Sequence, residues 1–268
     1  MKNILRMLVC IVAIAWTAAA RAQYTTVHDS PYATSTDSYA QERCKLDVHY
    51  SPKLKGAPVV VWFHGGGIEA GNKHIDAELQ EQGLVVIAAN YRLLPKAHID
   101  DCIDDTAAAV AWAFEHCAEY GGDPARIYLA GHSAGGYLID MVGLDKHWLA
   151  KYGVDADRIA AIVPFSGQCI THYNVRKLQG IGPLQPTIDE YAPLTHIRPD
   201  APPVVVISGD RNLELYGRYE EQAYFWRMLQ LVGHPKVLLY EMQGFDHGSM
   251  LHPAYHVQKE YIKHDSPK

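Results

Sequence analysis

The sequence has few of the residue patterns that hold metals or bind nucleic acid. Cysteine occurs only five times in 268 residues, and no C-x-x-C or H-E-x-x-H spacing is present, so a metal site has little support. Lysine and arginine form no cluster and the formal net charge is -6, which gives no reason to expect nucleic acid as a partner. Internal repeats and low-complexity tracts are absent. With 48% hydrophobic residues, the chain has enough apolar material for one globular domain with a substantial core.

Long apolar runs are also missing, apart from a short one at the amino terminus. Two basic residues precede an apolar stretch from 7 to 16, and small residues follow up to Ala22. This order is typical of a secretory signal peptide over residues 1–22, cut before Gln23. The run is too short to span a bilayer, so no stable membrane anchor is expected. We therefore expect an exported protein, periplasmic or secreted, with a single domain over residues 23–268.

The expected mature chain contains four cysteines, namely Cys44, Cys102, Cys117 and Cys169. Export permits disulfides, and the sequence does not choose among the possible pairings. Cys102 and Cys117 fall on the inward face of one predicted helix, too far apart along it to bond each other. Free, buried thiols are therefore the favoured interpretation.

Short apolar runs alternate with helical patterns along the chain. Runs without polar alternation, typical of strands buried on both faces, occur at residues 59–63, 84–88, 127–130, 159–164, 204–208 and 237–241. Apolar residues at helical spacing predict helices over 99–120, after residue 133, over 219–231 and at the C-terminus. Buried strands alternating with helices predict an α/β fold, with a mostly parallel sheet covered by helices on both faces.

Three stretches carry weaker patterns. Leu46, Val48 and Tyr50 alternate with polar residues and predict a half-buried strand. Residues 23–43, rich in Ser, Thr and Tyr, are predicted to form a loosely structured arm. Residues 168–201 lack strong periodicity between two core strands, and a loop of that length is typically a lid or substrate loop. A surface excursion without a role is the alternative.

Ser133 stands between glycines, in the segment GHSAGG over residues 131–136, directly after the apolar run at 127–130. This order predicts a strand that turns sharply into a helix, where a Cβ on the flanking residues would collide with neighbouring chain. The helix N-terminus would point free backbone N–H groups at whatever the hydroxyl attacks. A catalytic serine is the prediction, and a plain turn is the alternative.

A second glycine segment, HGGG over residues 64–67, follows the apolar run at 59–63. Consecutive glycines leave backbone N–H groups unshielded, as an oxyanion hole requires. Gly65 and Gly66, together with Ala134 next to the serine, are the predicted donors.

These segments occur together with Tyr91-Arg92-Leu93 and Gly122-Asp123-Pro124. In this order they resemble the α/β-hydrolase fold, in the esterase/lipase branch that contains hormone-sensitive-lipase-like and small BD-FAE-type carboxylesterases. The resemblance covers nearly the whole chain after residue 22. It implies an α/β-hydrolase fold without a large cap, and a serine esterase that forms an acyl-enzyme and needs no cofactor or metal. Its partner is a small-molecule ester, and the sequence indicates no oligomeric state.

The family also implies a triad in the order serine, an acid after the penultimate strand, and a histidine after the last strand. His247 follows the run at 237–241 and fits the last position, because histidine can take and return a proton near neutral pH. The sequence does not decide which residue supplies the acid, because Asn212 stands where the family usually has aspartate. Asp210, Glu214 through a slightly longer loop, or Asn212 itself are the three alternatives. A carboxylate is favoured, although Asp210 also suits a plain turn cap.

The expected substrate class follows from the length of the chain. The chain leaves little room for a large helical cap, which favours short-chain or aromatic acyl esters, including esters carried on carbohydrate. Candidate pocket walls are Ile68, Phe165, Gln168 and Tyr173, each of which also suits simple packing. Other classes on the same fold are a serine peptidase-like enzyme, an arylformamidase amide hydrolase, and a catalytically silent binding protein, for which Asn212 is the hint.

Overall fold

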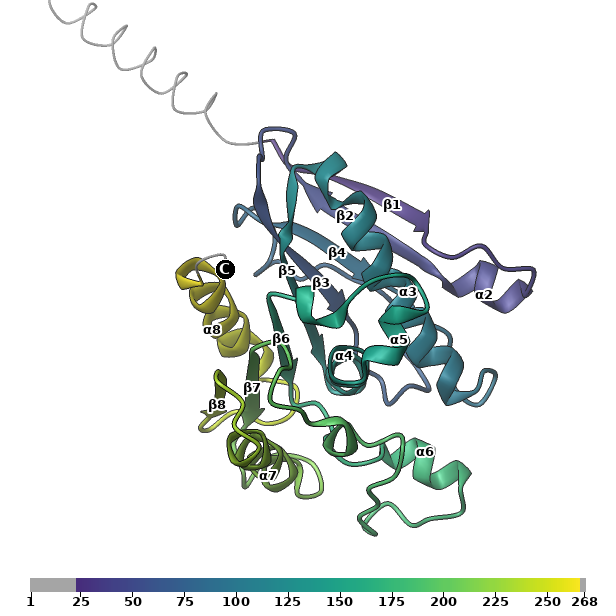
Figure 1. Ribbon diagram of the computed structural model, residues 1–268, viewed down its shortest axis with the longest axis vertical. Coiled ribbons are helices and arrows are strands. Elements are labelled where there is room, and N and C mark those ends of the chain that lie inside the picture. Colours follow the sequence, from purple (N-terminus) through teal and green to yellow (C-terminus); the bar gives the residue numbers. More distant parts are fainter. Residues whose placement is uncertain (1–22, 266–268) are drawn as a thin grey trace, which may run out of the picture.

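A computed structural model describes residues 23–265 of the chain. The predicted signal peptide over residues 1–22 lies outside the described residues. Within them, eight strands form one sheet in the order β1-β2-β4-β3-β5-β6-β7-β8 (Figure 1). The strands are β1 (Thr25–Pro31), β2 (Lys45–Tyr50), β3 (Ala57–Phe63), β4 (Val85–Ala89), β5 (Gly122–His132), β6 (Ala161–Phe165), β7 (Val204–Gly209) and β8 (Val237–Met242).

Helices fill most of the connections between these strands. The α-helices are α2 (Ser38–Arg43), α3 (Ile99–His116), α4 (Ala134–Leu144), α5 (Lys146–Ala150), α6 (Tyr173–Leu178), α7 (Arg218–Leu231) and α8 (Leu251–His264). Short 3-10 helices are η1 (Cys117–Tyr120), η2 (Ala156–Arg158) and η3 (Pro193–His196). No helix within residues 23–265 is long and apolar enough to cross a membrane.

The sheet is mostly parallel, as the alternation of strands and helices predicts. From β4 through β3, β5, β6 and β7 to β8, every neighbouring pair is parallel. The antiparallel pairs are β1 with β2 and β2 with β4, at one edge. Each apolar run expected to form a buried strand lies in a strand, and the bounds agree within two residues except that β5 begins five residues before its run. The run at 237–241 forms β8, which is only partly buried because it is the last strand at the sheet edge.

The strands are continuously apolar because both faces of the sheet are covered. In β3, Val59 and Val61 belong to one apolar layer, whereas Val60 and Trp62 belong to the other. The first layer includes buried residues of α3, α4 and α7, and the second includes Tyr255 of α8. Figure 1 shows α3, α4 and α5 on one side of the sheet and α8 on the other. Full burial of each such side chain contributes about 1.5–3 kcal/mol to the free energy of unfolding.

The prediction of a loosely structured arm over residues 23–43 is wrong. This segment forms β1 and α2, and β1 pairs antiparallel with β2 at the sheet edge. Side chains of β1 are largely exposed, so backbone hydrogen bonds define the strand and leave no apolar pattern in the sequence. Helix α2 begins at Asp37, whose carboxylate accepts from the N–H of Tyr39 at 3.0 Å, which is an N-cap contact.

The prediction for β2 is right about the strand and wrong about its exposure. Asp47 and His49, expected to face solvent, are 8% and 7% exposed. Asp47 is compensated by Lys73, whose Nζ lies 2.5 Å from its Oδ1, and Thr26 hydrogen-bonds to His49 Nδ1 at 2.9 Å. The polar positions of β2 therefore form a second buried face. Asp47 and the Nδ1 atom of His49 have partners there, whereas His49 Nε2 has none among the described residues.

The helix predicted over residues 99–120 is α3, with its last turn tightened into η1. Gly121 ends it in the left-handed region at φ 81°, a conformation that glycine adopts without steric cost. Cys44, Cys102, Cys117 and Cys169 are all free and buried. The interpretation of these cysteines as buried thiols is confirmed.

Candidate active site

The predicted site residues lie at one edge of the sheet, where the parallel strands end. The segment HGGG follows β3, Ser133 follows β5 and His247 follows β8. In the sheet β5 lies between β3 and β6, and β7 joins β6 to β8. The loops after these strands therefore meet at the carboxyl edge, where open parallel sheets bind ligands.

Ser133 occupies a strained turn between β5 and α4. Its φ and ψ are 55° and -113°, a region that side-chain-bearing residues rarely adopt and that is found at functional sites. Its N–H donates to the carbonyl of Phe165 at 2.8 Å, which ties the turn to the end of β6. The serine is 7% exposed, so its hydroxyl is held at the turn in a nearly closed environment.

The glycines around Ser133 are required by close backbone approach, as predicted. A Cβ on Gly135 would lie 2.6 Å from the carbonyl carbon of Phe63 and closer still to its oxygen. These atoms belong to the backbone of β3, which cannot yield as a flexible side chain would. Gly135 thus lets α4 begin directly against the neighbouring strand.

Substituting alanine for Gly135 tests this packing. Alanine normally stabilises a helix by about 1 kcal/mol relative to glycine, but here we expect the free energy of unfolding to fall by about 3 kcal/mol or more, because backbone must shift. The matched control is Gly182→Ala, since a Cβ there has nothing within 4 Å. Denaturant titration measures both, and equal stability of the two variants contradicts the close approach.

The HGGG segment crosses directly over the serine. A Cβ on Gly65 would lie 3.4 Å from the Cβ of Ser133 and 3.2 Å from the carbonyl oxygen of His132. Tyr91, from the YRL motif, donates its hydroxyl to the carbonyl of His64 at 2.8 Å and fixes the start of the loop. This places the glycine backbone beside the serine hydroxyl.

The predicted oxyanion donors have no competing acceptors. Backbone N–H groups of Gly65, Gly66 and Ala134 find no hydrogen-bond acceptor among residues 23–265. Ala134 is also the first residue of α4, where the helix dipole is positive. These three amides are available to a negatively charged oxygen above Ser133.

Two hydrogen bonds hold His247 in place, one to its ring and one to its backbone carbonyl. Its Nδ1 lies 2.8 Å from Oε2 of Glu214, whose side chain is only 1% exposed. His132, the neighbour of Ser133, uses its Nε2 to hydrogen-bond the His247 carbonyl at 2.8 Å, and the two rings lie 4.7 Å apart. The structure thus brings the loops of Ser133 and His247 together, as the sequence predicts.

Glu214 is kept ionised beside this histidine. Burial raises the pKa of its carboxyl, but hydrogen bonds from His247, Ser166 and the Gly209 N–H outweigh that and lower the pKa to about 2. The Gly209 N–H donates to Oε1 at 3.0 Å. A carboxylate in this state fixes the tautomer and orientation of the imidazole and stabilises its protonated form.

The expectation that Asp210 is an acid partner of the histidine is wrong. Its Oδ1 accepts from the N–H of Asn212 at 2.8 Å, and its Oδ2 accepts from the N–H of Gly244 at 2.8 Å. Asn212 also turns its side-chain amide to Asp210. Asp210 is the turn cap named as its alternative, and it ties the loop after β7 to the loop that carries His247. Neither Asp210 nor Asn212 has a hydrogen bond to His247 among the described residues.

Ser166 is a site residue that the sequence interpretation missed. Its Oγ lies 2.9 Å from Nδ1 of His247, its side chain is fully buried, and its φ of 50° is strained. Arg218, fully buried behind it, donates to its carbonyl. The available signal was a serine next to a glycine, two residues after the apolar run at 159–164.

Of the four predicted pocket walls, two are core residues. Ile68 and Phe165 are fully buried, and Phe165 packs against Trp62 with ring centroids 5.5 Å apart. Their apolar side chains are packed within the two apolar layers of the core. Gln168 and Tyr173 instead line a cavity of about 210 Å³ beside the site.

The segment over residues 168–201 contains α6 and η3 and is attached to the site. Asn174 donates its Nδ2 to the carbonyl of Gly67 at 2.6 Å, which joins α6 to the HGGG loop. Tyr137 in α4 donates its hydroxyl to the carbonyl of Tyr191 at 2.7 Å. The segment is therefore fixed at both ends against the elements that hold Ser133.

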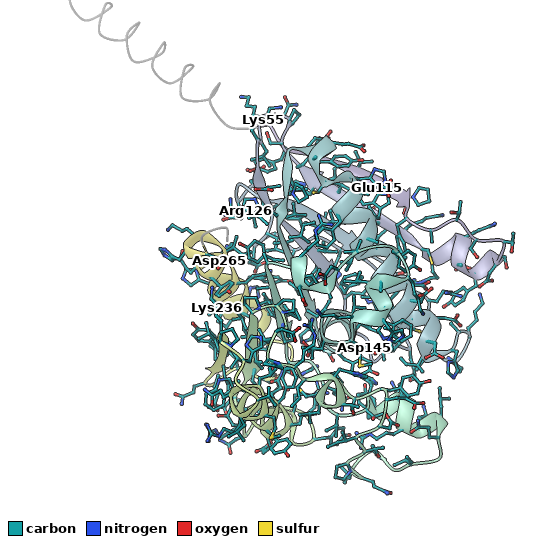
Figure 2. All side chains as sticks on the ribbon, in the orientation of Figure 1. Lys55, Glu115, Arg126, Asp145, Lys236 and Asp265 are labelled. Atoms are coloured by element: carbon teal, nitrogen blue, oxygen red, sulfur yellow. The ribbon has the colours of Figure 1, made fainter. Side chains whose placement is uncertain are left out.

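A roomier cavity lies away from these residues. It has a volume of about 450 Å³ and is lined by Arg126, Lys236 and Asp265, which Figure 2 labels close to one another. Arg126 lies in the first half of β5 and Lys236 directly precedes β8, so this cavity is toward the amino ends of the strands, opposite to Ser133. Within residues 23–265, no three His, Cys, Asp or Glu side chains are grouped to hold a metal ion.

Comparison with known families and proteins agrees with this geometry. The BD-FAE family model matches residues 46–214. The chain is 31% identical over 233 residues to a probable carboxylic ester hydrolase, LipM, of Mycobacterium tuberculosis, covering 75% of this chain and 53% of the relative. It is 27% identical to a probable isoprenylcysteine alpha-carbonyl methylesterase, ICMEL1, of Arabidopsis thaliana, covering 79% and 50%. The chain thus spans about half the length of these relatives.

Solved structures show the same fold. A truncated carbohydrate esterase from gut microbiota superposes with a TM-score of 0.76 at 18% identity, covering 93% of this chain and 99% of that one. Esterase 2 of Thermogutta terrifontis, phosphoramylated by tabun, superposes with a TM-score of 0.68 at 22% identity, covering 89% and 94%. The architecture is that of the α/β-hydrolase fold, as the sequence resemblance implies.

Proposed function

The chain belongs to the BD-FAE family, and from this premise we propose that it is a serine carboxylesterase that works through an acyl-enzyme. The observation that carries the proposal is the ion pair between His247 Nδ1 and Glu214 at 2.8 Å, on a histidine loop held by the neighbour of Ser133. With Nδ1 occupied, the other ring nitrogen, Nε2, is the one available to the serine hydroxyl.

The proposed reaction uses these groups in two half-reactions. His247 takes the proton of Ser133 as the hydroxyl attacks the ester carbonyl, and the backbone amides of Gly65, Gly66 and Ala134 stabilise the resulting oxyanion. Each well-placed donor lowers the barrier by about 2.7–4 kcal/mol. His247 then gives the proton to the departing alcohol, and water releases the acid by the same route.

Small acyl groups are the proposed substrates, in short-chain or aromatic esters and in esters carried on carbohydrate. Helix α6, the one α-helix in the segment over residues 168–201, has only six residues, which is too little to enclose a long acyl chain. The carbohydrate part of the proposal is supported by one structural neighbour, itself named a carbohydrate esterase.

A series of para-nitrophenyl esters from acetyl to dodecanoyl tests the proposed function. We expect kcat/KM to be highest for acyl groups of about four carbons or fewer and to fall by at least about tenfold at ten carbons, because longer chains leave apolar surface in water. The Ser133→Ala variant controls for non-enzymatic hydrolysis. A maximum at ten carbons or more contradicts the small acyl site, and no hydrolysis of any ester contradicts the esterase.

The geometry at His247 weakens one competing class, the catalytically silent binding protein. Asn212 was the feature that favoured a catalytically silent binding protein, and Glu214 now supplies the carboxylate at His247. Amide hydrolysis is measured in the same experiment with an aminoacyl nitroanilide and with N-formylkynurenine. We expect both to be turned over more slowly than the short esters.

A further inference from the structure

Arg176, on α6, is a buried cation without an ionic partner. Its side chain is 2% exposed, and no carboxylate within residues 23–265 lies at ion-pair distance from it. Nη1 donates to the carbonyl of Gln185, while Nε is shielded from solvent and has no acceptor in the described part of the chain. A guanidinium taken out of water is unfavourable unless an anion or several acceptors compensate it. Burial accordingly lowers the pKa of this group.

Arg176 is one of the residues that line the cavity of about 210 Å³ beside the site. The other walls are mainly apolar or aromatic and include Ile170, Tyr173, Pro183, Leu184, Pro186 and Tyr216. Leu184 and Tyr216 are 74% and 70% exposed, so the rim of the cavity carries apolar surface that is open to solvent. An apolar body that ends in an anionic group matches this combination of walls.

The same cavity also contains a complete ion pair, formed by Arg218 and Glu221. Arg218 Nε lies 3.1 Å from Oε1 of Glu221, and Oε2 of Glu221 accepts from the N–H groups of Cys169 and Ile170 at 3.0 and 3.1 Å. No oxygen of Glu221 lies at hydrogen-bond or ion-pair distance from Arg176. Because Arg218 and Glu221 cancel, the charge that remains at the cavity is the positive charge of Arg176.

The cavity adjoins the proposed reaction centre on two sides. Tyr173 lies beside the oxyanion loop, since a Cβ on Gly67 would be 2.7 Å from its hydroxyl. Arg218 donates to the carbonyl of Ser166, whose hydroxyl contacts His247. These contacts link the cavity to the loop of the predicted oxyanion donors and, through Ser166, to the Nδ1 side of His247.

We infer that this cavity is a substrate subsite for a carboxylate carried by the ester, and that Arg176 is the residue that selects it. The inference rests on the proposed esterase function and narrows it from small esters to esters with an anionic group. The carboxylate can belong to the acyl half, as in a half-ester of a dicarboxylic acid, or to the alcohol half, as in an ester of a hydroxy acid. In either case the guanidinium donates to it from an apolar surrounding, where such hydrogen bonds are strongest.

Two matched pairs of esters test the inference on the unmodified protein. The acyl arm compares monomethyl adipate with methyl adipamate, and the alcohol arm compares para-carboxyphenyl acetate with para-carbamoylphenyl acetate. Each pair differs only by carboxylate against carboxamide, and at about pH 7.5 the carboxylates are ionised. We expect kcat/KM to favour the carboxylate by about 10- to 100-fold in one arm, the range of a hydrogen bond to a charged group.

The variant Arg176→Gln then assigns the preference to this residue. It should reduce the carboxylate-to-carboxamide ratio at least about tenfold, while Arg176→Lys should retain part of it because the charge remains. Arg227→Gln is the matched control, because it removes the same charge from an exposed position on α7 whose guanidinium contacts Gln230. It should leave the ratio as it is in the unmodified protein.

The outcomes distinguish a failure of the carboxylate subsite from a failure of the esterase function. Hydrolysis of neutral short esters without a carboxylate preference in either arm overturns the subsite and leaves the esterase intact. Hydrolysis of none of the esters overturns the esterase itself. A preference that survives in Arg176→Gln, or an equal loss on both members of a pair, assigns Arg176 a structural role in holding Gln185 and also overturns the inference. The first comparison needs no variant, so it stands even if Arg176→Gln does not fold.

Discussion

Replacing Ser133 by alanine is expected to lower kcat for a short-chain ester by about 10⁶-fold, as removal of a serine nucleophile does elsewhere. The physical reason is that Ser133 lies against Gly65 and directly precedes Ala134, so the substitution removes the hydroxyl next to the proposed oxyanion donors. Ser166, the other serine at the site, has its Oγ 2.9 Å from Nδ1 of His247, on the side of the ring already used by Glu214. Steady-state hydrolysis of para-nitrophenyl acetate measures the loss.

A covalent probe makes this test specific. A fluorophosphonate should label one serine per chain, and peptide mass mapping should place the label on Ser133 and not on Ser166. The Ser133→Ala protein should remain folded by circular dichroism and bind no label. Residual activity within about 100-fold of the unmodified enzyme, or a label on another serine, shows that the nucleophile lies elsewhere.

The second large effect is expected at Glu214. Substitution by glutamine removes the negative charge 2.8 Å from His247 Nδ1 and lets the amide favour the wrong imidazole tautomer. We expect kcat to fall by about 10³- to 10⁴-fold, in line with amide replacement of a triad acid. The KM of a short ester should change little, because the carboxylate does not touch substrate in the proposed mechanism.

Asp210→Asn is the matched control for Glu214→Gln. Both changes replace a carboxylate by its amide in the loop after β7, but Asp210 accepts only from backbone N–H groups and from Asn212. The amide keeps one carbonyl oxygen for the N–H of Asn212 and loses the acceptor for the N–H of Gly244. Neither contact is made to His247, so kcat should fall by less than about tenfold. If Asp210→Asn is the more damaging change, the assignment of Glu214 as the acid fails.

Local patterns in the sequence were sufficient for most of the architecture. The run at 59–63 contains no polar residue, and the run at 204–208 contains one, Ser208, at its end. Neither run alternates in a way that would mark a solvent face, and both form buried strands of a parallel sheet. The segments HGGG and GHSAGG indicated where backbone would approach backbone. Such features depend on residues adjacent in the chain, so their physical cause is visible in the sequence.

Local patterns failed where backbone pairing or buried charge replaced apolar burial. Residues 23–43 form β1 and α2 because an edge strand needs only backbone hydrogen bonds and a short helix needs only a cap. Asp47 and His49 are buried against partners more than twenty residues away. The periodicity of one segment carries no information about a hydrogen-bond or ion-pair partner in a distant segment.

By itself the sequence determined the fold class, the turn at Ser133, the oxyanion segment and the loop that carries His247. The tertiary structure alone decided which carboxylate reaches that histidine, because Glu214 and His247 are 33 residues apart and their contact depends on how the loops after β7 and β8 pack. It also decided that Ser166 adjoins the imidazole and that Arg176 is buried without a counter-ion. These properties depend on charges and distances between residues that are far apart in the sequence. The order of neighbouring residues does not show them.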